Sequence, residues 1–276
     1  MAAAASGNAP VAGVLHTRGD PWERTADAGA RAAAIDEATD GMAHGVTESI
    51  RRAIVPVHPA GRPFIGLFAV ATVILFVVWQ PLGWIALILT LWCTAFFRDP
   101  KRVTPLSEGI AVAPADGRVA LVDHAPPPAE LGLGTEPRLR ISTFMSVFDV
   151  HVNRTPVAGR IVQSQHRAGR FLNAEDPAAS AENERQSILL DTAAGDIAVV
   201  MIAGLVARRI VPLHVIGDHL VAGERIGLIR FGSRVDVYLP AGARPLVAVG
   251  QRAVAGETPI ADLAGLRPAL DATRIG

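Results

Sequence analysis

The sequence predicts a mainly β (α+β) protein, in which a β-sandwich or barrel-like domain follows an N-terminal hairpin of two apolar helices. Three observations support this fold class. Residues 63–97 contain no charged side chain, short apolar or alternating runs follow Pro105, and a ten-residue pattern recurs near the C-terminus. The first observation is typical of membrane helices, and the other two of antiparallel β structure.

The composition excludes several classes of function. The chain has 276 residues with 26 basic and 26 acidic side chains, so its formal charge of zero gives no signature of nucleic-acid binding. The single cysteine, Cys93, excludes a disulfide framework or a cysteine-based metal site within one chain. Eight histidines are present, but none lies beside carboxylates at metal-ligand spacing, so we expect no metal.

Residues 1–50 are rich in Ala, Gly and small polar side chains and show no sustained hydrophobic period. This composition is typical of a disordered leader. The segment lacks the basic start, apolar core and cleavage site of a secretory signal. The sequence therefore predicts a disordered leader over 1–50, a helical hairpin with basic flanks over 51–102, and a catalytic domain over 103–276.

The uncharged run at 63–97 is too long for one straight membrane helix, because about 50 Å at ~1.5 Å per residue exceeds a hydrocarbon core of about 30 Å. Gln80-Pro81 interrupts the run, so we expect two helices near 64–79 and 82–97. Each is short for a full span, and a hairpin that dips shallowly into the bilayer stays open. A helical hairpin buried in a soluble core is the alternative.

Basic residues flank both ends of this hairpin, and they predict its orientation. By the positive-inside rule, both ends lie in the cytoplasm and the turn, flanked by Trp79 and Trp84, faces outward. The sequence thus predicts attachment to the cytoplasmic face of the cell membrane. The same charges could also attract anionic lipid. The basic residues are Arg51, Arg52, Arg62, Arg98, Lys101 and Arg102.

After Pro105, strand-like runs are separated by turn signals, and the polar loop 171–186 can carry a short helix. The pattern Gly217-Asp-His-Leu-Val-Ala-Gly-Glu-Arg-Ile returns at Gly250-Gln-Arg-Ala-Val-Ala-Gly-Glu-Thr-Pro, which suggests two hairpins like those of lipoyl carrier folds. The segment lacks the lysine that such carriers present. The expected strands are 110–113, 118–123, 138–145, 157–163, 187–191, 196–203, 205–213, 226–231 and 234–239.

An unusual Gly-Ser pair, Gly232-Ser233, directly precedes the last of these strands. Val235 and the apolar residues after it alternate with polar ones, as in a half-buried strand, and Ser233 has the parity of the apolar set. Gly232 has no Cβ, so another atom can approach its carbonyl closely. A buried hydroxyl beside an unshielded carbonyl can attack it, although a bulge or turn is the commoner explanation of such a pair.

Four motifs occur in order: Pro114-Ala-Asp-Gly117, Phe148-Asp-Val-His-Val-Asn-Arg-Thr-Pro156, Asn183-Glu-Arg185 and Phe231-Gly-Ser-Arg234. Following a hairpin that ends in Phe96-Phe-Arg-Asp-Pro100, they resemble the phosphatidylserine decarboxylase family, in particular its short bacterial and archaeal form. The resemblance runs from about Phe96 to Ile260 and therefore covers most of the ordered chain.

The resemblance implies a proenzyme that cuts itself between Gly232 and Ser233. Ser233 then becomes a covalent pyruvoyl cofactor at the head of an α chain, residues 233–276, which stays bound to the β chain, residues 1–232. The pyruvoyl carbonyl forms a Schiff base with the amine of phosphatidylserine, and decarboxylation yields phosphatidylethanolamine. His151 is the expected proton donor and Asp116 the expected base for self-cleavage, while Arg154 could bind the phosphate or carboxylate of the lipid.

The sequence departs from the long-form members at one position. These carry a second histidine three positions after the first, as the base of an Asp-His-Ser triad, and Arg154 stands there in this chain. Asp116 could therefore act on Ser233 directly, His151 could serve both steps, or another residue could complete the triad. The flanks Phe231 and Arg234 also differ from the Leu and Thr of the long form.

Two other functions remain open at this stage. A membrane-tethered lipoyl-like adaptor would explain the repeat and the hairpin, but it gives Asp116, His151 and Ser233 no common purpose. A pyruvoyl enzyme that decarboxylates another amino compound, such as a soluble amino acid or archaetidylserine, keeps the chemistry. Only a soluble substrate would leave the membrane hairpin unexplained.

Overall fold

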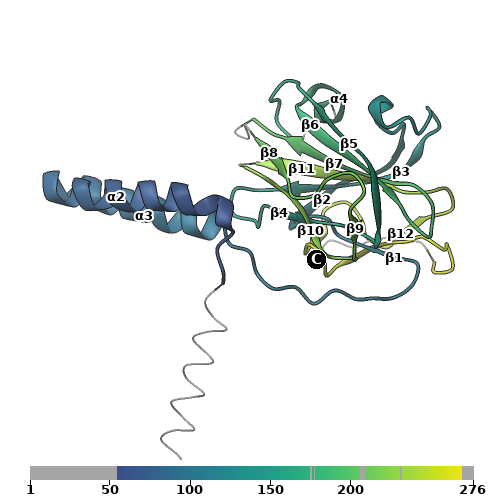
Figure 1. Cartoon of the computed structure of the whole chain (residues 1–276), viewed down its shortest axis with the longest axis horizontal. Helices are drawn as coiled ribbons and strands as arrows, with labels where there is room; N and C mark the ends of the chain where they lie inside the picture. Colours follow the sequence, from purple (N-terminus) through teal and green to yellow (C-terminus); the bar gives the residue numbers. More distant parts are fainter. Residues whose placement is uncertain (1–54, 175, 177, 206–208, 231, 269–276) are drawn as a thin grey trace, which may run out of the picture. The chain divides into compact units, whose positions relative to one another are not determined.

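The computed structural model describes residues 55–174, 176, 178–205, 209–230 and 232–268 (Figure 1). The leader predicted over 1–50 lies outside the described residues. The described chain begins with a helical hairpin and continues as a domain built mainly of β strands.

A short 3-10 helix, η1 (Pro59–Gly61), leads into α2 (Arg62–Val78), and α3 (Gln80–Phe96) follows. Between them, Trp79 adopts an extended conformation with φ −162° and ψ 112°. Pro81 lies in the first turn of α3, where its missing N–H costs no hydrogen bond. The two predicted helices are thus confirmed, and their bounds differ from the prediction by at most two residues.

The two helices pack through small and polar side chains. The hydroxyls of Thr72 and Thr90 lie 2.9 Å apart, and a Cβ on Gly83 would lie 2.4 Å from the Phe76 ring. The apolar faces turned away from this contact are exposed. Residues Pro59–Val78 are long and apolar enough to cross a membrane, and 11% of that window is buried inside the protein. Most of this window is thus exposed in the described chain, and insertion of the hairpin into a membrane stays a prediction.

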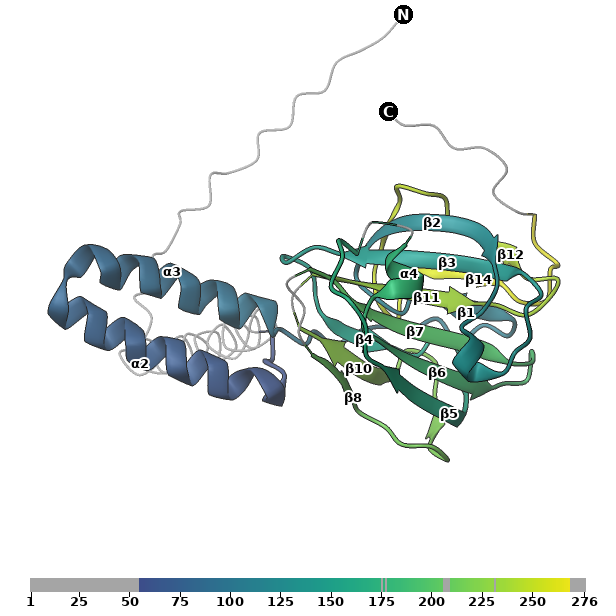
Figure 2. The same cartoon turned by 90° about the horizontal axis from the view of Figure 1, so that it is seen from above.

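The β domain is organised around one curled eight-stranded sheet that forms a half-barrel (Figure 2). Its strand order is β13-β2-β3-β11-β7-β6-β5-β9, and all its described pairs are antiparallel. The strands are β2 (Gly117–Ala125), β3 (Arg138–Met145), β5 (Gly159–Arg167), β6 (Arg185–Asp191), β7 (Ile197–Ala203), β9 (His219–Leu220), β11 (Ser233–Tyr238) and β13 (Arg252–Ala253).

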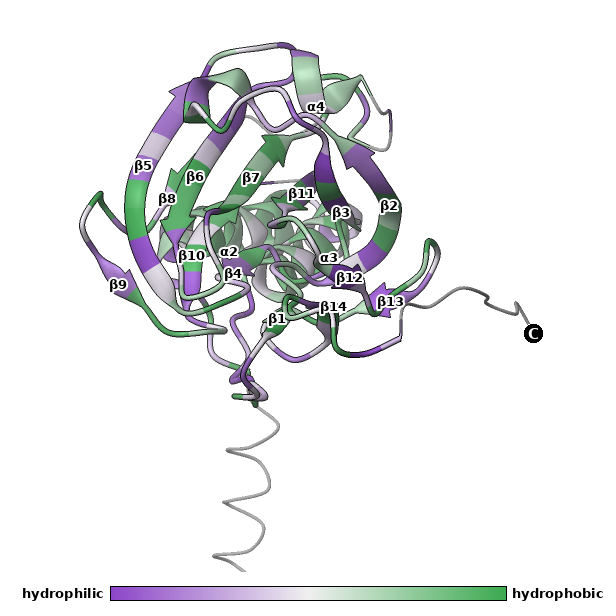
Figure 3. Ribbon diagram, turned by 90° about the vertical axis from the view of Figure 1, so that its right-hand side faces the viewer, coloured by the Kyte–Doolittle hydropathy of each residue, from purple (hydrophilic) through white to green (hydrophobic). Residues whose placement is uncertain are grey.

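Two three-stranded sheets complete the domain, with the orders β1-β14-β12 and β4-β10-β8. Their strands are β1 (Ile110–Val112), β4 (Val152–Arg154), β8 (Ile210–Pro212), β10 (Arg225–Ile229), β12 (Arg244–Pro245) and β14 (Pro259–Asp262). Every residue of β7, at the middle of the large sheet, is buried, whereas β5 near its edge carries exposed polar residues (Figure 3). The main core therefore lies over β3, β11 and β7.

Most of the strands predicted from apolar runs are confirmed. The run at 157–163 forms β5 from Gly159 onward, and the run at 205–213 gives only β8 among its described residues. The loop 171–186 carries the expected short helix, α4 (Ala179–Glu182), while η2 (Ala129–Leu131) was not predicted. The runs also missed β4, β9, β12, β13 and β14, because strands of two to four residues carry too little hydrophobic period.

The prediction that β11 is half-buried is wrong. Arg234 and Asp236, expected on a solvent-facing side, are both fully buried. Arg234 donates hydrogen bonds to the carbonyl oxygens of Ala174 and Asp176, and Asp236 accepts one from Ser180. The loop that carries α4 therefore covers the second face of the strand, and β11 is buried on both sides.

The two Gly-Glu turns of the repeat adopt the same conformation. Gly223 and Gly256 have φ values of 77° and 75°, a left-handed conformation that is unfavourable for residues with a Cβ. Their N–H groups donate to the carbonyl oxygens of Thr155 and Ala113, respectively. A Cβ on Gly256 would lie 3.4 Å from the Gly223 Cα. The repeated sequence therefore produces two like turns that lie against each other. The expected hairpins are wrong, because β9 and β10, and likewise β13 and β14, pair with other strands and not with each other.

Candidate active site

The Gly232–Ser233 bond lies at the start of β11, between the ends of its two neighbouring strands. Ser233 pairs with Met145, the last residue of β3, and with Ala203, the last residue of β7. The Ser233 side chain is fully buried, as its parity predicted, and its Oγ lies 3.9 Å from the Met145 sulfur. This sulfur is a weak acceptor, so it leaves the hydroxyl free to react.

Gly232 has a left-handed backbone with φ 56°, a conformation that glycine adopts at no steric cost. Its carbonyl oxygen accepts a hydrogen bond of 3.0 Å from the Gly204 N–H. The carbonyl that Ser233 would attack is therefore held in place by the first residue after β7.

His151 directly precedes β4 and is fully buried. Its Nδ1 lies 3.0 Å from the carbonyl oxygen of Asp149, while Nε2 is buried without a hydrogen-bond partner. Because a carbonyl oxygen only accepts hydrogen bonds, Nδ1 carries the proton and Nε2 presents a lone pair. Burial lowers the pKa of His151 to about 4, so the ring is neutral at pH 7.

The surroundings of His151 fix its orientation. The Phe96 ring, at the end of α3, lies with its centroid 4.2 Å from that of the imidazole. Asp149 accepts hydrogen bonds from the N–H and hydroxyl of Ser146 and from Arg252. Burial alone would raise the pKa of Asp149, but these bonds hold it below its ordinary value. The loop that orients His151 is therefore itself tied down.

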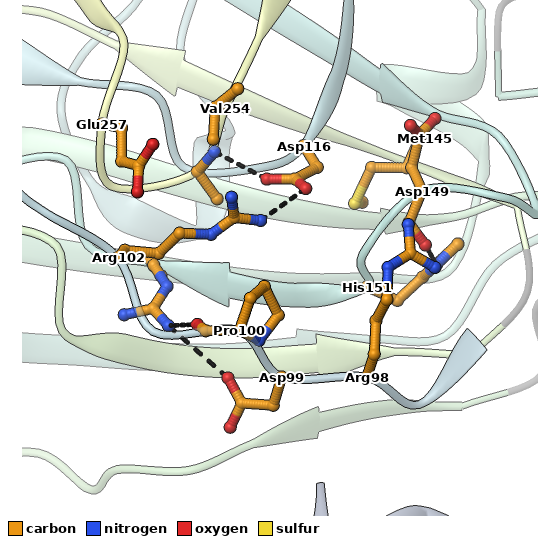
Figure 4. A network of polar contacts seen from close by, with 12 residues as sticks. Arg98, Asp99, Pro100, Arg102, Asp116, Met145, Asp149, His151, Val254 and Glu257 are labelled. Carbon is orange, nitrogen blue, oxygen red and sulfur yellow. Dashed lines mark hydrogen bonds and ion pairs between the residues drawn. The ribbon is translucent and has the colours of Figure 1, made fainter. Parts of the chain in front are cut away.

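Asp116 lies in the turn before β2, close to the end of β3. Gly117 makes this approach possible, because a Cβ there would lie 2.0 Å from the Phe144 carbonyl oxygen. Asp116 Oδ1 accepts a hydrogen bond of 2.8 Å from the Ala255 N–H, and Oδ2 forms an ion pair of 2.6 Å with Arg102 (Figure 4). Both oxygens of the expected base are therefore engaged within the described chain.

Asn153 joins these groups around Met145. It lies two residues after His151, in β4, and its Nδ2 donates to the Met145 sulfur at 3.4 Å. The Asn153 Oδ1 is buried without a partner. The fold thus brings Asn153 and Ser233 to one thioether, and Figure 4 draws Asp116, Met145 and His151 in the same view.

Arg154 is buried on β4 and contacts the connector, residues 97–109, which joins the hairpin to β1. Its guanidinium donates to the carbonyl oxygens of Gly223 and Pro100 at 2.8 and 3.1 Å. It also lies 3.5 Å from Asp99, which in turn pairs with Arg225 at 2.7 Å. These contacts fasten the connector to the β domain, and binding of the lipid by Arg154 stays a prediction.

The sequence missed several groups of the site. Asn183 was part of a motif but received no role, and here its amide bonds the Leu172 backbone and the Ala203 carbonyl oxygen. Gly204, directly after the apolar run 196–203, received no role from the sequence. A cavity of about 640 Å³, lined by Leu106, Val157, Leu263 and others, contains none of the predicted site residues.

Comparison with known proteins places these features in a family. The family model described as phosphatidylserine decarboxylase matches residues 89–261, more than half of the chain. The chain belongs to the phosphatidylserine decarboxylase family. The matched range agrees with the resemblance expected from Phe96 to Ile260. A relative described as a phosphatidylserine decarboxylase proenzyme, from Beijerinckia indica subsp. indica, is 59% identical over 217 residues, which cover 79% of this chain and 94% of the relative.

Proposed function

We propose that this chain is the self-cleaving precursor of a membrane-attached, pyruvoyl-dependent phosphatidylserine decarboxylase. Family membership and the name of the close relative support the activity. The observation that carries the proposal is the position of Ser233, whose buried hydroxyl adjoins a Gly232 carbonyl held by the Gly204 N–H. This arrangement fits formation of the cofactor from the chain itself.

Self-cleavage begins when Ser233 Oγ loses its proton and attacks the Gly232 carbonyl carbon. The peptide C–N bond then breaks, its nitrogen gains a proton, and an ester replaces the amide. Removal of the Ser233 Cα proton expels the Gly232 carboxylate and leaves dehydroalanine. Water converts this residue to a pyruvoyl group with release of ammonia. The β chain ends at Gly232, and the α chain begins at residue 233.

We assign the base for the first step to His151. Its Nε2 carries a free lone pair, whereas both oxygens of Asp116 are already bonded. Of the alternatives left open by the sequence, His151 acting in both steps agrees best with these contacts. Asp116 would then position the turn beside Met145. Normal self-cleavage of a His151→Ala precursor would contradict this assignment and return the role to Asp116 or to another group.

In the mature enzyme, the pyruvoyl group supplies an electron sink for the carbanion left when the head-group carboxylate departs. His151 returns a proton to the Cα atom of the head group. Its low pKa in the precursor means that it must first gain a proton. The negative charges of a bound phospholipid favour the protonated ring, because an opposite charge nearby raises the pKa of a histidine.

The hairpin supports a lipid substrate. We propose that α2 and α3 anchor the protein at the cytoplasmic face, with the basic flanks on that side of the bilayer. Phe96 at the end of α3 touches the His151 ring, so the anchor ends directly at the proposed proton donor. A head group in the membrane would therefore reach His151 without leaving the bilayer surface.

Mass spectrometry of the purified protein tests the proposal. We expect two chains, the smaller beginning with a pyruvoyl group at position 233, and conversion of phosphatidylserine but not of free serine. A Ser233→Ala variant should stay uncut and inactive. An intact chain that still decarboxylates the lipid would refute the mechanism. An intact, inactive chain would favour the adaptor, although the only lysine, Lys101, lies outside both Gly-Glu turns.

A further inference from the structure

The peptide group that joins Ala203 to Gly204 lies against the bond to be cleaved. Its N–H donates to the Gly232 carbonyl oxygen at 3.0 Å, one position beyond the β7–β11 pairing. With φ 56°, Gly232 has already left the β conformation, so regular sheet pairing does not require this bond. We propose that the Gly204 N–H, positioned by Asn183, is the oxyanion donor for self-cleavage; this inference rests on the function proposed above.

Residue 204 must lack a side chain for this contact to form. A Cβ would lie 2.3 Å from the Gly232 oxygen and 3.2 Å from the Ala174 Cβ. The φ angle of Gly204 lies outside the left-handed region, so its backbone conformation alone does not call for glycine. The glycine is explained by the close approach of its N–H to the scissile carbonyl.

Asn183 fixes the other end of the same peptide group. Its Nδ2 donates to the Ala203 carbonyl oxygen at 2.8 Å and to the Leu172 carbonyl oxygen at 2.9 Å, and its Oδ1 accepts from the Leu172 N–H at 2.9 Å. The side chain is fully buried. A hydrogen bond to the carbonyl of a peptide polarises its N–H, so Asn183 both orients the donor and strengthens it.

The donor acts where charge develops. As the Ser233 Oγ–C bond forms, the π-electron pair of the carbonyl moves onto the Gly232 oxygen, which becomes an oxyanion. The Gly204 N–H then bonds a full negative charge instead of a neutral carbonyl, and this bond strengthens. When the C–N bond breaks, the pair returns to form the ester carbonyl. Gly204 thus contributes a catalytic N–H, and Asn183 is a positioning residue.

An amide-to-ester substitution tests the donor without changing any side chain. Glycolic acid incorporated at position 204 of the full-length chain, translated in the presence of lipid nanodiscs, replaces the N–H by oxygen. We expect self-cleavage to slow about a hundredfold, as for other single oxyanion donors. The control is the same substitution at Gly195, in the turn before β7, whose N–H donates to the Thr192 carbonyl oxygen at 3.0 Å. Cleavage near the wild-type rate, or slowed equally by both substitutions, would overturn the inference.

A conventional variant tests the positioning role. Asn183→Asp keeps the acceptor for Leu172 but removes both donors, so we expect slow self-cleavage with normal decarboxylation per pyruvoyl group formed. Gln186→Glu is the control, because Gln186 is a buried amide on β6 that bonds Ser164 instead. Equal cleavage by Asn183→Asp and wild type would contradict the role. If the wild-type chain itself is never cut, the proposed function is refuted. If the wild-type chain is cut but the ester at position 204 and Asn183→Asp do not slow the cleavage, only the oxyanion donor is refuted.

Discussion

The guanidinium of Arg102 donates to the carboxylate of Asp116 across 2.6 Å. Arg102 lies in the connector that follows the hairpin, and Asp116 lies beside the strand end that pairs with Ser233. This ion pair links the connector to the turn that the sequence identified as part of the self-cleavage machinery. Arg102, which the sequence placed among the basic flanks of the hairpin, is therefore half-buried beside Asp116.

We predict that Arg102→Ala slows self-cleavage about tenfold, because Asp116 loses one of its two partners and its turn is held less firmly. Pulse labelling followed by denaturing electrophoresis measures the rate. Lys101→Ala is the matched control, since it removes the same charge from the neighbouring, exposed position. Equal rates for the two variants would show that the ion pair does not influence the site.

The stability of the precursor should depend on His151 below neutral pH. Its pKa is lowered from 6.5 to about 4, so the unfolded chain binds the extra proton first as the pH falls. The free energy of unfolding should therefore be highest above pH 6.5 and fall by about 3 kcal/mol toward pH 4. Urea unfolding of the uncut Ser233→Ala chain measures this slope.

A His151→Asn change in the same uncut chain should remove most of that slope, because no histidine remains to be protonated there. His219→Asn, at an exposed position, should leave the slope in place. If the slope survives in the His151 variant, another group is responsible for it.

The buried pair formed by Arg234 and Asp236 should be costly to break. Their side chains lie 2.9 Å apart, and both are fully buried. Arg234→Met should destabilise the fold by about 3–5 kcal/mol, because it leaves a buried carboxylate without its charged partner. Thermal unfolding of the uncut chain measures the loss.

The double variant Arg234→Met/Asp236→Leu provides the control for that measurement. Removing both charges should recover much of the stability, since no unpaired buried charge remains. A double variant that loses the sum of the two single effects would mean that the two residues do not interact.

The contact between α2 and α3 can be tested in native membranes. In a Cys93→Ser background, cysteines at positions 72 and 90 should form a disulfide on oxidation, because the threonine hydroxyls there lie 2.9 Å apart. Loss of both thiols to a maleimide reagent reports the bond. Cysteines at the exposed positions 73 and 91 should stay reactive, and a disulfide there instead would refute this packing.

Much of the fold could be predicted because its signals are local. Gln80-Pro81 interrupts an uncharged run, and the chain changes from one helix to the next at Trp79. The apolar runs at 138–145 and 196–203 formed strands at nearly the same bounds. Most strands of two to four residues were missed, since pairing with distant segments defines them and the period of their own side chains does not.

The candidate site was only partly predictable. The motifs identified Gly232, Ser233, His151 and Asp116 as a group, and in the structure Ser233 and the Asn153 that follows His151 both contact the Met145 sulfur. No spacing indicated that Arg102 would bind Asp116. Nor did any motif identify Gly204, because its importance comes from an atom of another strand that occupies the place of its missing side chain.

By itself, the sequence determined the helical hairpin, the β character of the rest, the family, and a Gly232–Ser233 pair with its hydroxyl turned inward. These features follow from composition, hydrophobic period and the order of the motifs, all of which can be read from residues close together in the sequence. Only the tertiary structure decided that Arg234 and Asp236 are buried, that Nε2 of His151 is free, and that a peptide N–H from β7 bonds the scissile carbonyl. Those features depend on contacts between segments far apart in the chain, and such contacts exist only once the sheet has closed over its core.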